Sequence, residues 1–214
     1  MAQTTLAHHF KDLEQQREAS TLGMWVFLVT EIMFFGALFT SYIVYRSLHP
    51  LAFAEVSRHL DIVLGTVNTA VLIGSSFTMA LAVYSAQTGR RTRLVFFLSF
   101  TVILGLAFLG IKFLEYYHKF QEHHVPGPYF SYPGSFSQQA KMFFSLYFAM
   151  TGLHALHMIV GVGVLSVLII LAWRGRFTPE YHSPVELSGL YWHFVDIIWI
   201  FLYPLLYLIG RHLG

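Results

Sequence analysis

Five apolar segments, each long enough to cross a lipid bilayer, dominate the sequence. They cover approximately residues 22–45, 61–84, 94–114, 142–173 and 186–209. A membrane-spanning helix needs about 20 mainly apolar residues, and in lipid a helix satisfies its own backbone hydrogen bonds. The sequence therefore predicts an all-α polytopic membrane protein, with a single membrane domain over residues 1–214 formed by a bundle of five transmembrane helices.

The composition agrees with a chain that is surrounded by lipid. Hydrophobic residues make up 56% of the chain and charged residues only 11%, whereas soluble domains carry about 25% charged residues. The chain has no cysteine, which excludes disulfides and thiolate metal sites. Its formal net charge of +2 is too small to suggest a nucleic-acid partner.

The connections between the segments predict an orientation. The one long connection is expected over residues 115–141, where several glycines and prolines mark non-helical chain. Cytoplasmic loops carry an excess of lysine and arginine. The N-terminus is therefore predicted to be cytoplasmic. The basic residues expected on its face are Lys11, Arg17, Arg90, Arg91, Arg93, Arg174 and Arg176, against Arg46, Arg58, Lys119, Lys141 and Arg211 on the other.

Glu31 stands near the middle of the first apolar segment and is its only charged residue. An acidic side chain at the bilayer centre costs about 2.5–3.5 kcal/mol on insertion scales, so such residues are rare unless they face a partner, a cavity or a proton path. The flanking Phe34, Phe35 and Leu38 cannot solvate a charge. Glu31 is therefore predicted to be a buried functional carboxylate.

Other polar side chains recur at steps of three or four residues inside the remaining segments, a spacing that aligns them along one face of a helix. Interhelical hydrogen bonds and close packing account for such faces in membrane proteins. In this interpretation His193 or nearby tryptophan and tyrosine donors hold the Asp196 carboxylate. The residues expected to form an intramembrane polar network or to contact lipid are Asn68, His154, His157, Trp192, His193, Asp196 and Tyr203.

The histidines also allow a metal-site hypothesis. His154 and His157 are one helical turn apart, and His193 with Asp196 could approach from another helix. Imidazole and carboxylate ligands suit zinc, iron or copper. A histidine pair without a ligand-rich motif is an unspecific signal, however. We therefore predict no metal site and no catalytic residue in this chain.

Two long strings resemble subunit III of the haem-copper cytochrome oxidases. Residues 191–203, YWHFVDIIWIFLY, are similar to that family's signature in its last helix, and residues 151–161, TGLHALHMIVG, are similar to its His-x-x-His-Val-x-x-Gly element. Residues 30–35 resemble the segment that bears the family's carbodiimide-reactive membrane glutamate, which corresponds to Glu31 here. Shorter matches at residues 68–69, 75–76 and 115–117 extend the resemblance over residues 20–210.

The resemblance implies a non-catalytic accessory subunit of a proton-pumping haem-copper terminal oxidase, which serves aerobic respiration. Its partners would be oxidase subunit I, which carries haem and copper and reduces oxygen to water, other oxidase subunits, and membrane lipids including bound phospholipid. The implied roles are to stabilise the core subunit, to shape oxygen and lipid access, and to support proton uptake. The resemblance implies no cofactor in this chain itself.

The chain departs from the longer members of this family in two ways. Those members have seven helices, whereas this chain resembles the five-helix bacterial forms, quinol oxidases included, which begin at the equivalent of the third helix. The expected location is therefore the bacterial plasma (inner) membrane. The lipid-filled cleft that the first two helices form in the longer members is expected here only if a neighbouring subunit supplies those helices. Lys112 stands where the family usually has an uncharged residue. We expect its ammonium group to extend toward the membrane interface.

Two other functions remain open from the sequence. One is the accessory subunit of a related nitric-oxide reductase, and the other is a free-standing membrane metalloenzyme that uses His154, His157 and His193. A histidine-box oxygenase would place many histidines at the membrane surface, whereas residues 118–124 hold the one such cluster here, with three histidines. This counts against the enzyme. The electron donor of an oxidase, cytochrome c or quinol, docks on other subunits and is not indicated by this chain.

Overall fold

The computed structural model of the protein describes residues 10–133 and 136–208. Five helices in this part of the chain are long and apolar enough to span a membrane. The prediction of an all-α bundle with five spans is confirmed, while the predicted helix end at residue 209 and Arg211 lie outside the described residues. The elements are α1 (Leu13–Leu48), α2 (Pro50–Ser57), α3 (Ile62–Gln87), α4 (Arg91–Gln121), α5 (Ser137–Trp173), α6 (Ser183–Tyr203) and the π-helix η1 (Pro204–Leu208).

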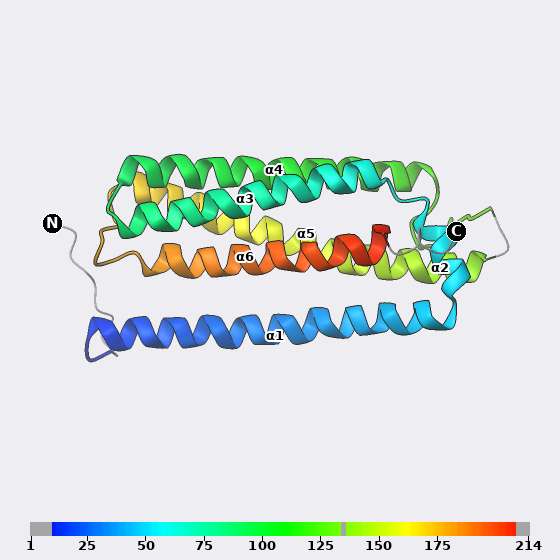
Figure 1. Cartoon of the computed structure of the whole chain (residues 1–214), viewed down its shortest axis with the longest axis horizontal. Coiled ribbons are helices and arrows are strands. Elements are labelled where there is room, and N and C mark those ends of the chain that lie inside the picture. The colour runs from blue at the N-terminus through cyan, green and yellow to red at the C-terminus, as the bar shows by residue number, and fades with distance from the viewer. Residues whose placement is uncertain (1–9, 134–135, 209–214) are drawn as a thin grey trace.

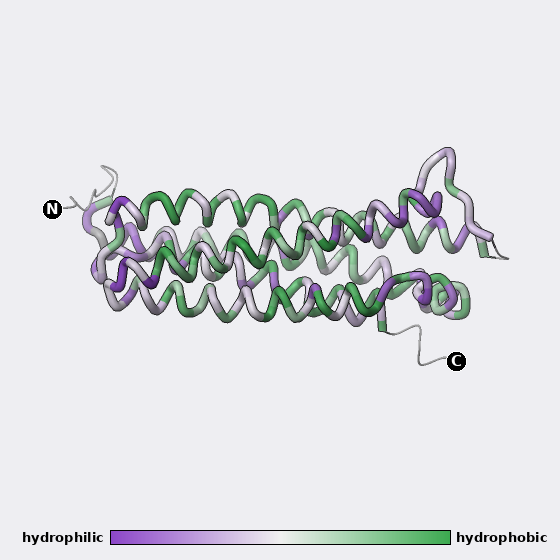
Figure 2. Tube along the Cα trace, turned by 90° about the horizontal axis from the view of Figure 1, so that it is seen from above, coloured by the Kyte–Doolittle hydropathy of each residue, from purple (hydrophilic) through white to green (hydrophobic). Residues whose placement is uncertain are grey.

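The spanning helices run along the long axis of the molecule (Figure 1). α3 and α4 lie on one side, α1 lies on the opposite side, and α5 and α6 lie between them. Hydrophilic residues gather at the two ends, and hydrophobic residues dominate the middle (Figure 2). α1 is the most exposed of the spans and packs against α5 and α6, whereas α6 is the most buried. Polar side chains on α5 and α6 are therefore placed to meet partners on the other helices.

Several helices continue beyond their predicted apolar segments into polar sequence. α1 begins at Leu13, where the Asp12 side chain accepts a hydrogen bond from the Gln15 backbone N–H. This is a favourable N-cap, and α1 is nine residues longer at this end than the apolar segment suggests. α4 continues to Gln121, so the predicted connection over residues 115–141 is wrong in extent and covers only residues 122–136. The short helix α2, which starts at Pro50, was not predicted.

The connections α3–α4 and α5–α6 begin in the same way. Each contains, two residues after the helix ends, a glycine with positive φ, 66° at Gly89 and 70° at Gly175, a conformation that glycine adopts without strain. In both turns the next backbone N–H returns to the last helical turn, and so does the N–H of the glycine itself. The outer bonds run from Arg90 N–H to Ser85 O and from Arg176 N–H to Leu171 O.

Candidate functional site

Glu31 on α1 is paired with His157 on α5. His157 Nε2 lies 3.1 Å from Glu31 Oε2, and His157 Nδ1 lies 2.9 Å from the backbone oxygen of Leu153. A carbonyl only accepts, so Nδ1 carries a proton and donates it to Leu153. The contact between Nε2 and Glu31 then holds one further proton, either on the carboxyl group or on the imidazole. His157 is therefore the polar partner of the Glu31 carboxyl group, which its apolar neighbours on α1 cannot provide.

The Glu31–His157 pair is mostly buried but keeps some exposed surface. The side chains of Glu31 and His157 are 19% and 14% exposed. The Phe35 ring lies 5.5 Å from the imidazole, and the Tyr191 hydroxyl donates to the His157 backbone oxygen at 2.9 Å. The pair therefore connects α1, α5 and α6 at the place where α1 meets the rest of the bundle.

Four hydrogen bonds connect α6 to α3 along the length of the two helices. Each joins a hydroxyl group on α3 to an aromatic side chain on α6. Such bonds replace the hydrophobic drive that is missing between helices in lipid. The pairs are Ser76 with His193 Nδ1 (2.7 Å), Ser75 with Trp192 Nε1 (2.9 Å), Thr69 with Trp199 Nε1 (3.0 Å) and Thr66 with Tyr203 Oη (2.6 Å).

Glycines allow the aromatic side chains of α6 to enter the bundle. The Trp192 ring is fully buried between Gly105 on α4 and Gly161 on α5. A Cβ atom would lie 2.8 Å from the ring at Gly105 and 2.9 Å at Gly161, and Gly65 on α3 is equally close to the Tyr203 ring. Side chains at these glycines would displace the rings, so the four helices depend on them for their spacing.

Two predicted polar residues, Asp196 and His154, lack the hydrogen-bond partners that were expected. Neither Asp196 carboxyl oxygen has a hydrogen-bond partner in the described chain, so the expected bond from His193 is wrong. His193 bonds to Ser76 instead, although Ser76 also lies close to Asp196. Both ring nitrogens of His154 lack partners there as well, because aromatic rings enclose it, while Asn68 reaches a backbone oxygen on α4 at 3.4 Å.

The predicted site residues therefore do not converge on one centre. His157 faces α1, His193 faces α3, and His154 lies between the rings of Phe108 and Trp199, with ring centroids 5.3 and 5.2 Å away. Among the described residues, no group of three or more histidine, aspartate or glutamate side chains is arranged to hold a metal ion. In the described structure the predicted residues that form hydrogen bonds to other helices are Asn68, His157, Trp192, His193 and Tyr203.

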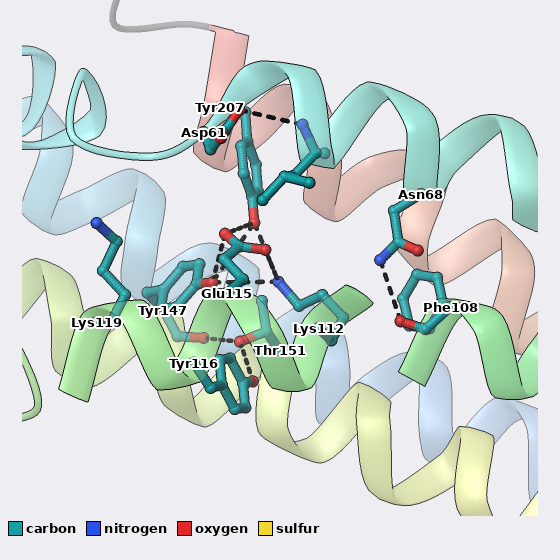
Figure 3. A network of polar contacts seen from close by, with 12 residues as sticks. Asp61, Asn68, Phe108, Lys112, Glu115, Tyr116, Lys119, Tyr147, Thr151 and Tyr207 are labelled. Atoms are coloured by element: carbon teal, nitrogen blue, oxygen red, sulfur yellow. Dashed lines mark hydrogen bonds and ion pairs between the residues drawn. The ribbon is translucent and has the colours of Figure 1, made fainter. Parts of the chain in front are cut away.

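A second buried polar centre was missed by the sequence reasoning. Lys112 Nζ donates to Glu115 Oε2 at 2.9 Å, to the Tyr147 hydroxyl at 3.1 Å and to the Tyr207 hydroxyl at 3.0 Å (Figure 3). Both tyrosines also donate to Glu115 Oε1. The prediction that Lys112 extends toward the interface is wrong, because this residue is only 2% exposed.

Both charges of this centre are fully satisfied. The ammonium group uses its three protons on three oxygens, and the carboxylate accepts from one lysine and two tyrosines. The Nζ atom also lies 4.9 Å from the centre of the Trp199 ring, a favourable cation–π contact. A complete network of this kind rigidifies a core. It joins α4 to α5 and to η1, the last described segment.

The sequence did contain a signal for this centre. A lysine and a glutamate three residues apart in apolar sequence can pair along a helix, and ionisable residues inside a span almost always face a partner or a cavity. The predicted helix ended at residue 114, which assigned Glu115 to a loop and separated it from Lys112. The two tyrosines come from distant segments, and only the fold identifies them.

A polar cavity of about 510 Å³ lies beside Glu115 at this end of the bundle. Lys119 in its wall donates to the His59 backbone oxygen at 2.8 Å and to Glu122 at 2.6 Å, and His124 Nδ1 lies 3.0 Å from the same Glu122 oxygen. Burial by itself raises the pKa of Glu122, but Lys119 and His124 outweigh it and lower that pKa. Burial, with help from Lys119, lowers the pKa of His124.

An apolar groove of about 510 Å³ lies between α1 and α6. Trp25, Ile32 and Phe39 on α1 and Ile197 and Phe201 on α6 contribute to its walls. It has the lining of a site for hydrocarbon. It is separate from the polar cavity, which involves neither α1 nor α6.

The helical bundle and its buried pairs define a polytopic membrane protein whose polar interior joins helices. The family model for cytochrome c oxidase subunit III matches residues 3–211 of the chain. The chain belongs to this family. The resemblance seen in the helix signatures is thereby confirmed over nearly the whole sequence.

The relatives include subunits of two kinds of oxidase. The chain is 34% identical to cytochrome c oxidase subunit 3 of Synechocystis over 191 residues, which cover 87% of the chain and 74% of that relative. It is 31% identical to quinol oxidase subunit 3 of Bacillus spizizenii over 202 residues, which cover 92% of each. It is 30% identical to cytochrome bo(3) ubiquinol oxidase subunit 3 of Pseudomonas aeruginosa over 194 residues, covering 89% of the chain and 85% of the relative.

Proposed function

We propose that this protein is the non-catalytic accessory subunit III of a proton-pumping haem-copper terminal oxidase. The observation that carries the proposal is membership of the subunit III family over residues 3–211, with relatives named subunit 3 of cytochrome c and quinol oxidases. Its partners are oxidase subunit I and the other oxidase subunits. Haem and copper belong to those partners, which reduce oxygen to water.

The buried contacts support a bracing role for this chain. Glu31 and His157 connect the exposed helix α1 to α5, and the Lys112–Glu115 centre connects α4, α5 and η1. A bundle fixed at these two places offers a rigid surface to a neighbouring subunit. In this function Glu31 holds α1 in position and shares a proton with His157, and the chain thereby supports proton uptake by its partner.

The apolar groove between α1 and α6 supports phospholipid binding. Its lining residues are almost entirely apolar or aromatic, as an acyl chain requires, and His193 is the polar group at its wall. Phospholipid held there would shape lipid and oxygen access to the core subunit.

The location proposed is the bacterial plasma (inner) membrane, with a cytoplasmic N-terminus. Bacterial relatives and the five apolar spans support the first part. The excess of arginine at the connections α3–α4 and α5–α6 supports the second, because these connections share the end of the bundle at which α1 begins (Figure 1).

Elemental analysis and an optical spectrum of the purified single chain test the non-catalytic assignment. The expected result is a chain without a Soret band and without stoichiometric copper, iron or zinc, while the assembled oxidase shows haem and copper. A haem spectrum or a stoichiometric metal in the single chain would contradict the proposal.

A further inference from the structure

Helix α1 touches the rest of the bundle along one narrow line. Among its residues 14–48, the buried ones are Leu28, Phe35 and Tyr42, which follow one another at intervals of seven. Seven residues are almost two helical turns, so these three side chains lie along one edge of the helix. Each of the other four spanning helices buries more residues. The position of α1 therefore depends on a small number of contacts.

A cluster of aromatic rings anchors the end of α1 that leads into α2. The centre of the Tyr42 ring lies 5.5 Å from that of Phe53 on α2 and 6.1 Å from that of Phe143 on α5, and the Phe53 and Phe143 rings are 5.5 Å apart. All three side chains are almost fully buried. The chain adds a second tether, because α2 begins two residues after α1 ends. This end of α1 is therefore firmly held.

Between this cluster and its start, α1 stands away from α6. The apolar groove of about 510 Å³ separates residues 25–39 of α1 from α6. A second cavity, of about 440 Å³, has Arg17 and Thr21 of α1 in its wall, and His193 of α6 lines both. Tyr42 lines neither of them. On the side that faces α6, α1 is therefore loosely packed over residues 17–39 and closely packed at Tyr42.

Two polar contacts hold this loosely packed length of α1, and they differ in strength. Arg17 Nη2 lies 3.5 Å from Glu186 Oε2, but the Arg17 side chain is 59% exposed, and exposed ion pairs contribute little. Glu31 and His157 are 3.1 Å apart and mostly buried. The Glu31–His157 pair is therefore the main polar contact that ties the middle of α1 to the bundle.

We propose that α1 is a hinged arm, with its pivot at the Tyr42 cluster and the Glu31–His157 pair as the latch that holds it closed. With the latch closed, α1 is a fixed part of the bundle. With the latch released, α1 swings about the pivot, and the apolar groove widens because its α1 wall moves away from α6. The inference does not depend on the proposed oxidase function, because it concerns contacts within this chain alone.

A hinge fixes how the displacement varies along α1. Each residue moves in proportion to its distance from the pivot. Val26 lies 16 residues from Tyr42, about 24 Å along the helix, and Val44 lies two residues away, about 3 Å. A rotation of about 10° would therefore move Val26 by about 4 Å and Val44 by less than about 1 Å.

Double electron–electron resonance between spin labels measures both displacements in the full chain in lipid nanodiscs. The chain has no cysteine, so labels attach only at introduced positions. One pair is Val26→Cys with Leu106→Cys on α4, and the other is Val44→Cys with Tyr117→Cys on α4, all at exposed positions. Because α4 lies on the opposite side of the bundle, Glu31→Ala should lengthen the first distance by about 4 Å and change the second by less than about 1 Å.

Two further variants separate the latch from a general loosening of the bundle. Glu31→Gln keeps a hydrogen-bonding group for His157 and should leave both distances as in the parent. Thr30→Ala is the matched control, because the Thr30 hydroxyl donates only within α1, to the Phe27 backbone oxygen at 2.6 Å. It should also leave both distances unchanged, and all variants should keep the helical circular dichroism of the parent.

Three outcomes would overturn the proposal. Unchanged distances in Glu31→Ala would show that the pair is not a latch. Equal lengthening of both distances would show that α1 detaches as a whole and has no pivot at Tyr42. The same lengthening in Thr30→Ala as in Glu31→Ala would show that any change on α1 loosens it, whether or not the pair is intact.

Discussion

Lys112 and Glu115 form an ion pair of 2.9 Å inside a membrane-spanning helix, with each side chain 3% exposed. Tyr147 and Tyr207 complete the pair from α5 and η1. A buried pair gains little over apolar residues of the same shape, but breaking it by removing one partner is costly. The pair therefore makes the position of η1 depend on two charges on α4.

Replacement of one member of this pair should destabilise the protein strongly. Lys112→Met leaves the Glu115 carboxylate buried without its cation, and about 3–5 kcal/mol of unfolding free energy should be lost. Thermal or denaturant unfolding in detergent measures this loss. Lys141→Met, at an exposed position near the start of α5, serves as the matched control and should change stability little.

The double variant Lys112→Met/Glu115→Leu should recover part of that loss, because the buried charge is removed while the Tyr147 and Tyr207 hydroxyls lose Glu115 as their acceptor. Both charges are then gone, and apolar groups of similar size fill the site. The interaction free energy from the four proteins of this cycle measures the coupling. Strictly additive losses would contradict the structure, because they would mean that Lys112 and Glu115 do not interact.

Glu31 should tolerate an amide better than a methyl group. Glu31→Gln keeps the size and a hydrogen-bonding group for His157, so assembly should be nearly normal. Glu31→Ala leaves His157 Nε2 without its partner, at a cost of about 1–3 kcal/mol. In both variants an assembled oxidase should still reduce oxygen, because the proposed function assigns that chemistry to a partner subunit. Complete loss of oxygen reduction in an assembled Glu31→Gln complex would contradict this assignment.

A hydrophobic carbodiimide should label Glu31 selectively. The reagent partitions into the membrane and attacks the protonated acid, and the Glu31–His157 contact holds one proton between the two groups. Glu14, Glu18 and Glu180 are exposed at the end of the bundle and should react little. Peptide mapping after labelling checks this. A label spread evenly over the exposed carboxylates is the outcome that the structure does not permit.

Acidification below about pH 6.5 should lower the stability of the folded chain through Glu122 and His124, which lie in the segment that connects α4 to α5. The pKa of His124 is lowered from its ordinary 6.5 by burial and by Lys119, so in this range the unfolded chain binds a proton that the folded chain does not. The pKa of Glu122 is also lowered, from 4.5, so its contribution is present above about pH 4.5 and is lost as the pH falls through its lowered pKa. Both groups therefore make stability decrease toward acid pH.

Melting temperatures across pH compare the parent with two variants. His124→Gln should flatten the decrease between about pH 6.5 and 5, whereas His118→Gln, at an exposed position on α4, should leave it unchanged. An identical pH profile for the parent and His124→Gln would contradict the proposed contribution of His124.

The five spans could be predicted from sequence because lipid requires long apolar helices, and Glu31 stands out because it is the only charge in its segment. The partner of Glu31 is an α5 residue 126 positions away, and only the packing of α1 against α5 identifies it. Lys112 was misplaced because its partners include Tyr147 and Tyr207, whose approach depends on how α5 and η1 pack. His154 lacks the expected bond because Phe108 and Trp199 fill its surroundings.

Co-purification tests the central claim most directly. The tagged chain is extracted from native membranes in a gentle detergent, and its partners are identified by mass spectrometry and by the optical spectrum of the complex. The account predicts recovery with a larger subunit that carries haem and copper and reduces oxygen. Recovery of the chain alone, in a form that is itself an active metalloenzyme, would contradict the account.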